Sequence, residues 1–144
     1  MTRSLGERLS AEGEDPERYR WHFMNKNHRE ADNFIPLMNY AKMFSKSGAA
    51  FEADVKNFVD LDGWFRGLSC AVLSGATDNF AGDGSQHNAW FYARPDGRVI
   101  FLPHDMDNGY TSGLTIFNNP HCAALTVNPA RRRQYLGHLH DIIS

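Results

Sequence analysis

The chain has 144 residues, of which 42% are hydrophobic and 12% aromatic, so it can bury the core of one domain. Its formal net charge of -2 excludes the basic surface on which nucleic-acid binding depends. No apolar run approaches the roughly 20 residues that cross a bilayer, and residues 1–15 are too polar for a secretory signal. We therefore expect neither a nucleic-acid partner nor a membrane span.

The two cysteines exclude a zinc ribbon, because Cys70 and Cys122 lie far apart and neither belongs to a CxxC pair. Cys70 falls in an apolar helical run and is predicted to be a small residue of the core. A disulfide between the two stays open as an alternative, so cysteine usage does not decide the cellular compartment.

The first part of the chain predicts a lead-in followed by a helix. Residues 1–18 are rich in charge and glycine, and we expect them to be a poorly ordered lead-in to a core over 19–144. Apolar side chains recur at helical spacing within 29–46, and Pro36 places the regular start between residues 32 and 35. These apolar positions are Phe34, Leu37, Met38, Ala41 and Phe44.

Two more helical stretches follow. Residues 51–59 are amphipathic, and Asp60 is placed to cap a helix that runs to Leu73 and ends at Gly75. This later helix is apolar almost all round, which predicts that it is buried. The three tryptophans are predicted to lie in the core: Trp21, Trp64 and Trp90.

The middle of the chain predicts a β-hairpin between two polar loops. Residues 76–87 read as a loop, and strands over 89–94 and 98–103 flank a Pro-Asp-Gly turn. An acidic loop begins at His104, and a Gly/Ser/Asn-rich segment then extends to Asn119. The predicted fold class is α+β, with helices packed around a β-hairpin that has acidic loops at its ends.

A final helix is predicted from Asn128 and Pro129, which have the residue types preferred at the cap and the first helical position. We expect Leu136, Leu139 and Ile143 to face inward from it. Arg131, Arg132 and Arg133 open this helix and are predicted to be solvated or to pair with the acidic loops.

Both loops beside the hairpin carry carboxylates. The first contains Asp78 and Asp83 and closes at Asn88, and the second contains Asp105 and Asp107. A hairpin brings the start of its first strand beside the end of its second, so we expect Asn88 and His104 to be neighbours and the carboxylates around them to converge. Carboxylate and amide oxygens suit Mg²⁺ or Mn²⁺, and such ions bridge phosphates in phosphoryl transfer.

The spacing of Asp83 and Asn88 is D-x-x-x-x-N, as in the catalytic loop of protein kinases. In those enzymes a short hairpin also separates this loop from a second, metal-binding aspartate, and Asp105 occupies the corresponding place here. The spacing is weak evidence alone and becomes informative with the hairpin and the D-x-D of residues 105–107.

Residues 86–92 (QHNAWFY), 94–98 (RPDGR) and 101–107 (FLPHDMD) resemble the CotH kinase family, the spore coat protein H-like atypical protein kinases. The resemblance covers about residues 19–143 and is strongest over 86–109. His104 stands where many members have tryptophan before the D-x-D.

The resemblance implies an ATP-dependent protein kinase that phosphorylates Ser or Thr of a protein substrate, on the large lobe of a divergent kinase-like fold. Asp105, Asp107 and Asn88 would bind Mg²⁺ or Mn²⁺, and Asn88 would contact ATP. Lys26 is a second candidate contact of ATP because its charge could neutralise phosphate, with a solvated surface position as the alternative. The catalytic aspartate stays open. Asp83 has the better spacing from Asn88, whereas Asp78 lies in a Gly-Ala-Thr-Asp stretch similar to the Gly-Asn-x-Asp of the family.

The family has a small lobe with a phosphate-contacting lysine, and residues 1–18 predict no such sheet. We therefore expect a partial kinase core with weak or no turnover by itself, which a separate N-terminal lobe could complete. Two alternatives remain: a non-catalytic pseudokinase or surface-assembly module, and a metal-dependent phosphohydrolase that uses His87 and His104 with the two aspartates of the D-x-D. Family members are often spore-coat, envelope or secreted proteins, which implies an extracytoplasmic place.

Overall fold

A computed structural model describes residues 11, 13–76, 79–83, 87–107, 109–110 and 115–144. Within these residues the chain forms seven α-helices and one two-stranded antiparallel hairpin, which confirms the predicted α+β class. The helices are α1 (Pro16–His22), α2 (Ile35–Met43), α3 (Gly48–Phe58), α4 (Leu61–Leu73), α5 (Phe80–Asp83), α6 (Pro120–Leu125) and α7 (Pro129–Ile143). The strands are β1 (Ala89–Ala93) and β2 (Val99–Pro103), and a 3-10 turn covers Arg29–Ala31.

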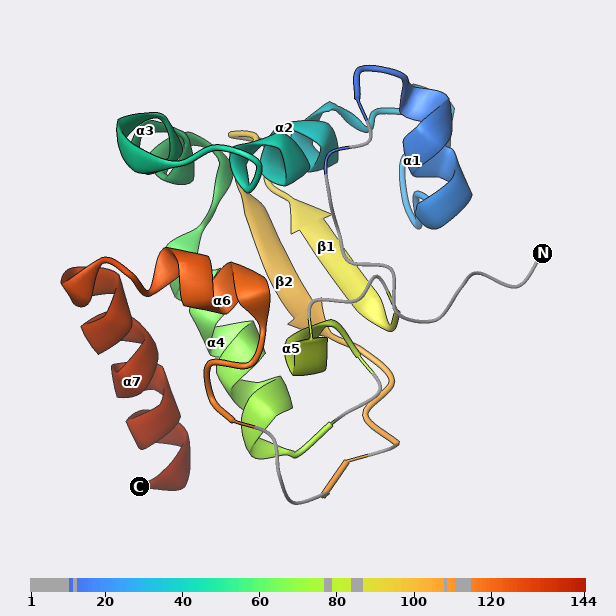
Figure 1. Cartoon of the computed structure of the whole chain (residues 1–144). Helices are drawn as coiled ribbons and strands as arrows, with labels where there is room; N and C mark the ends of the chain where they lie inside the picture. Colours follow the sequence, from blue (N-terminus) through green and yellow to red (C-terminus); the bar gives the residue numbers. More distant parts are fainter. Residues whose placement is uncertain (1–10, 12, 77–78, 84–86, 108, 111–114) are drawn as a thin grey trace.

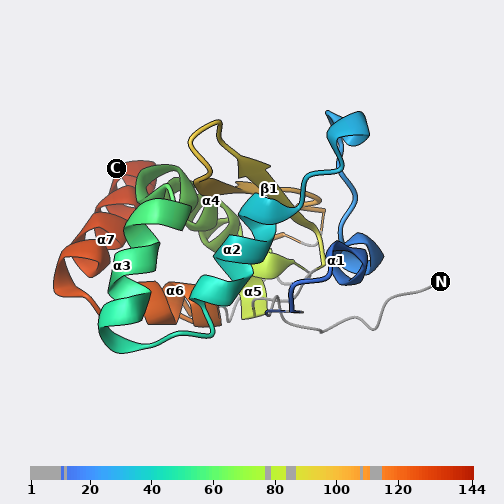
Figure 2. The same ribbon diagram turned by 90° about the horizontal axis from the view of Figure 1, so that it is seen from above.

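The hairpin lies at the centre of the molecule, with helices around it (Figure 1). Helix α4 packs along β2 on one side and against α7 on the other, so it forms the middle of the core. Seen from above, α1 lies at the opposite side of the molecule from α7 (Figure 2). None of the helices in the described part of the chain combines the length and hydropathy of a membrane span.

Asp60 starts α4 as predicted and also ties it to the hairpin. Its Oδ1 accepts a hydrogen bond of 3.2 Å from the Gly63 amide, and its other carboxylate oxygen binds the Arg94 guanidinium at the end of β1. Burial acts to raise the pKa of Asp60, but the Gly63 and Arg94 bonds outweigh it and lower that pKa. The cap therefore remains a carboxylate that bridges a helix start and a strand end.

The hairpin has one face in the core and one face outward, as strand pleating requires. Val99 and Phe101 are buried against α4, whereas Trp90, Tyr92 and Leu102 are exposed by 42%, 45% and 41%. The prediction that Trp90 lies in the core is therefore wrong, because its position in the pleat places it on the outward face. Trp64, in contrast, is fully buried as predicted.

Three short helices lie where the sequence predicted none, and one of them, α1, begins at Pro16 within the residues that were expected to be a lead-in. Residues 76–87 were expected to be a loop but contain α5. Asn79, directly before this helix, accepts a hydrogen bond of 2.9 Å from the Ala81 amide. The N-terminus of α6 has an Asn119-Pro120 start, with Asn119 capping the Cys122 amide at 2.9 Å. This is the same signal that correctly predicted α7 from Asn128 and Pro129.

The inward face of α7 differs from the prediction. Leu139 is buried, but Leu136 and Ile143 are 40% and 71% exposed, because the buried row starts at Arg131 and continues through Tyr135.

Trp21 is 64% exposed, so its predicted place in the core is also wrong. Cys70 is exposed too, since its part of α4 faces away from the residues packed on β2 and α7, and neither cysteine forms a disulfide.

Arg131 is the exception among the three arginines of α7. Only about a tenth of its side chain is exposed, and its two terminal nitrogens bind the two carboxylate oxygens of Glu52 in α3 at 2.7 and 2.8 Å. Its Nε also donates to the Leu125 carbonyl at 2.6 Å. Arg131 thus joins α3, α6 and α7, and is neither solvated nor paired with an acidic loop.

We expect Glu52→Gln to lower the free energy of unfolding at pH 7 by about 1–2 kcal/mol, because it leaves a buried guanidinium without its charged partner. The hydrogen bond from Arg131 lowers the pKa of Glu52 in the folded protein. The Glu52 carboxylate therefore stabilises the folded protein fully above its unfolded pKa of about 4.3, and this stabilisation is lost as pH falls through the lower pKa of the folded protein. Urea unfolding of the unchanged protein and of Glu52→Gln at pH 7 and pH 3 measures the difference in their free energies of unfolding at each pH.

Glu30→Gln is the matched control, since the Glu30 side chain is 80% exposed. It should change the free energy of unfolding by less than about 0.5 kcal/mol at either pH. An equal loss of stability for Glu52→Gln at pH 7 and pH 3 would contradict the assigned role of the Glu52 carboxylate.

Candidate active site

The open end of the hairpin brings the two acidic loops together. The strand register ends at the pair Ala89 and Pro103, so the next residues, Asn88 and His104, are neighbours across the hairpin as predicted. Asn88 and Asp105 both have left-handed backbone conformations, with φ of 47° and 54°. Asn and Asp adopt this conformation more readily than most residues, so the residue types fit the backbone on both sides of the open end of the hairpin.

Several contacts hold the acidic loop against the end of α4 and the start of α5. The Asn79 amide lies 3.6 Å from the Met106 sulfur, which links α5 directly to the D-x-D segment. The Tyr110 amide donates to the carbonyl of Ser74 at the C-cap of α4. A Cβ on Gly109 would lie 2.9 Å from the Met106 carbonyl oxygen, so this turn leaves no room for a side chain.

Helix α5 is fixed from a distant part of the sequence. The side-chain amides of Asn118 and Asn119 donate to the carbonyls of Gly82 and Phe80. The Phe80 ring packs against the hairpin, with its centroid 4.9 Å from that of Phe101. Helix α5 thus lies beside the open end of the hairpin (Figure 1), and Asp83 is its last residue.

The two candidate catalytic aspartates are described to different extents. Asp78 lies outside the described residues, and for Asp83 the structure describes the backbone as the end of α5 but not the side chain. The choice between Asp78 and Asp83 therefore stays a prediction. The acidic loop is described at both of its aspartates, and the side chains of Asp105 and Asp107 are exposed.

The donor set at the open end suits a magnesium ion shared with a phosphate. Among the described residues no group of three or more His, Cys, Asp or Glu side chains could hold a metal ion. Mg²⁺ in nucleotide sites is usually held by one or two carboxylates, and substrate phosphates and water complete its six ligands. Asn88, which precedes β1, and Asp105 and Asp107, which follow β2, all supply hard oxygen atoms, so they are the residues that would hold such an ion.

The phosphohydrolase alternative predicted from the sequence needs a metal site made of two histidines and two aspartates. His104 stacks on Trp90, with ring centroids 4.3 Å apart and an interplanar angle of 22°, and its Nδ1 is buried with no hydrogen-bond partner in the described part of the chain. The described side chains of His87, His104 and the two aspartates do not assemble into a metal-binding group.

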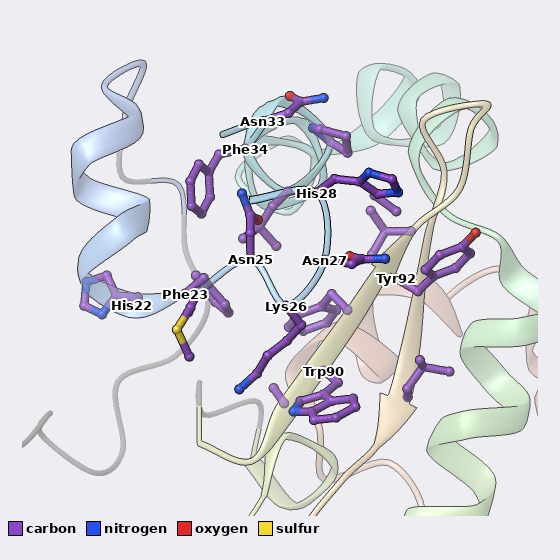
Figure 3. A pocket seen from close by; sticks show the side chains of 18 of the residues that line it. His22, Phe23, Asn25, Lys26, Asn27, His28, Asn33, Phe34, Trp90 and Tyr92 are labelled. Atoms are coloured by element: carbon purple, nitrogen blue, oxygen red, sulfur yellow. The ribbon is translucent and has the colours of Figure 1, made fainter. Parts of the chain in front are cut away.

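A groove of about 1000 Å³ starts at this end and follows β1. One wall is the chain from His22 to Leu37, and the other is the outward face of the hairpin, which includes Trp90 and Tyr92 (Figure 3). Asn88 and His104 line the groove together with Lys26. The structure therefore brings Asn88 and Lys26, the two predicted nucleotide contacts, to one groove.

Sequence reasoning missed the residues that fix this site in place. Asn79, Asn118 and Asn119 position α5 through buried or partly buried amide hydrogen bonds. An Asn-Pro cap signal at residue 119 could have found one of them, whereas the other two have no local signal. The stacking of Trp90 and His104 also follows only from strand register, because Trp90 lies in β1 and His104 directly follows β2.

Comparison with known proteins gives one match. The profile of a family described as CotH kinase protein matches residues 4–131, which is most of the chain. No curated protein and no solved structure matches it. The match includes both acidic loops, the hairpin and the first residues of α7. On the evidence of this match over residues 4–131, the chain belongs to the CotH kinase family.

Proposed function

We propose that this chain carries the catalytic loop of a kinase that transfers phosphate from ATP to Ser or Thr of a protein substrate, with Mg²⁺ or Mn²⁺. The observation that carries the proposal is the meeting of Asn88 and the D-x-D segment at the open end of the hairpin, where a groove begins. Family membership supports a kinase-like function in general.

Each candidate residue has a role set by its chemistry. Asp105, with Asn88 and Asp107, would hold the divalent ion, which when bound offsets negative charge on the phosphates. Asp78 or Asp83 would orient the acceptor hydroxyl and take its proton. Lys26, which lines the groove, would neutralise phosphate charge with its ammonium group. Positioning and electrostatics would supply most of the catalysis.

The same proposal includes a small lobe that covers the groove and an extracytoplasmic location. The groove is open along the outward face of β1, and a small lobe of the kind the family has would cover it. We also infer an extracytoplasmic place, such as a spore coat or envelope, from the family alone. Both statements can be tested independently of the catalytic chemistry.

Calorimetric titration with ATP in the presence of Mg²⁺ or Mn²⁺ tests the proposal. We expect heat that requires both ATP and metal, followed by slow transfer of radiolabelled phosphate to Ser or Thr of a protein. A folded protein that binds no ATP under any metal condition would contradict the kinase role and favour a non-catalytic assembly module. Hydrolysis of a model phosphoester without ATP would favour a phosphohydrolase instead.

A pair of substitutions identifies the catalytic aspartate. Of Asp78→Asn and Asp83→Asn, we expect one to reduce phosphate transfer at least about 100-fold, because the acceptor hydroxyl loses its general base. The same variant should bind ATP with metal as the unchanged protein does, since its carboxylate does not contact the metal. Equal transfer rates in both variants would mean that neither residue is the base.

A further inference from the structure

The groove along β1 is lined by a pair of stacked aromatic rings next to the candidate metal-binding residues. Trp90 and His104 lie on the outward face, and their rings stack at 4.3 Å and 22°. We call this pair the Trp90–His104 stack. It exists because strand pleating turns both residues to the same side: Trp90 pairs with Leu102, two residues before His104. Trp90 remains 42% exposed, so its ring has surface left for a ligand.

The chemistry of the lining favours an anionic ligand. The described residues that line the groove include Lys26 and four histidines but no Asp or Glu. The Lys26 ammonium lies 5.8 Å from the centroid of the Trp90 ring (Figure 3). A cationic side chain beside an exposed aromatic ring suits a ligand that carries both a flat ring and negative charge.

The position of the stack along the strands indicates which part of such a ligand it meets. Trp90 follows Asn88 by two residues, or roughly 7 Å of extended strand, and His104 directly precedes Asp105. A nucleotide with its phosphates at Asn88 and Asp105 would have its base displaced from them. Along the groove, that displacement leads to the Trp90–His104 stack.

We infer that the Trp90–His104 stack is the surface on which the base of the nucleotide packs, with the Lys26 side chain beside it. This inference rests on the proposed function, because it assumes that the phosphates lie at the open end of the hairpin. Stacking recognises the flat face that every base has and not its edge, so the stack itself discriminates weakly between adenine and guanine. Binding of the base requires no metal.

Titration with ADP in the absence of metal tests the stack directly. We expect Trp90→Ala to weaken ADP binding about tenfold or more, and Trp90→Phe to stay within about threefold because an aromatic face is kept. His104→Ala should weaken it as well, and His104→Phe should restore it. Trp21→Ala is the matched control, since Trp21 is exposed and does not line the groove.

The outcomes separate this inference from the proposed function. Metal-dependent ATP binding that Trp90→Ala leaves unchanged would overturn the stack and leave the kinase role intact. ADP binding that depends on Trp90, in a protein that transfers no phosphate, would support the stack and overturn only the kinase role. A folded protein that binds neither nucleotide would overturn both. Thermal unfolding of every variant verifies that loss of binding is not loss of fold.

Discussion

Gly67→Ala is expected to lower the free energy of unfolding by about 3 kcal/mol or more, which is a drop in Tm of roughly 6–12 °C. A Cβ at Gly67 would lie 2.2 Å from the Phe101 carbonyl oxygen of β2. That oxygen belongs to the backbone of a buried strand and cannot rotate away. Helix α4 would have to move off the hairpin, and the packing of buried Phe101 and Trp64 would be lost with it.

Gly137→Ala in α7 is the matched control, because a Cβ there meets nothing within 4 Å. Alanine favours a helix over glycine by up to about 1 kcal/mol, so this variant should be as stable as the unchanged protein or more so. Thermal and urea unfolding of both variants measures the contrast. A Tm for Gly67→Ala within about 2 °C of the unchanged protein would mean that α4 does not pack so closely on β2.

Removal of the Asp105 carboxylate is expected to weaken binding of ATP with metal at least about 100-fold, because in the proposed function the ion would lose a carboxylate ligand next to Asn88. Phosphate transfer should fall at least as far. The choice of substitution matters because Asp105 has φ of 54°. Alanine in this left-handed conformation costs about 1–2 kcal/mol, whereas glycine adopts it without strain.

Asp105→Gly and Asp105→Asn therefore separate a ligand role from a backbone role. Calorimetric titration should show loss of metal-dependent ATP binding in the Gly, Asn and Ala variants alike, and unfolding should show the largest loss of stability for Ala. Asp141→Ala, at an exposed site near the end of α7, should change neither. Binding lost only in Asp105→Ala would point to backbone strain and against a metal ligand.

Local signals in the sequence predicted most of the elements. Asp60 and Asn128 accept hydrogen bonds from the first amides of α4 and α7, and a side chain two or three residues from its partner needs no tertiary contact to cap a helix. The Pro-Asp-Gly turn likewise predicted the hairpin and its register. From that register followed the neighbouring positions of Asn88 and His104, and so the location of the candidate site.

Burial was predicted less well, because it depends on which faces meet. Trp21 and Trp90 are as apolar as Trp64, yet only Trp64 projects from α4 to where Phe80 of α5 and Tyr40 of α2 contact it. The Trp64 indole donates a hydrogen bond of 2.9 Å to the Tyr40 hydroxyl, so its polar atom is satisfied within the core. No pattern around residue 21 or 90 distinguishes these three side chains.

The sequence by itself therefore determined the α+β class, the helix caps, the hairpin and the family, since each depends on residues close together in the chain. Only the tertiary structure decided what joins distant segments. Arg131 meets Glu52 across 79 positions, Asn119 holds α5 across 39, and His104, directly after β2, stacks on Trp90 of β1. Such contacts form because packing brings their elements together, and local propensity carries no information about them.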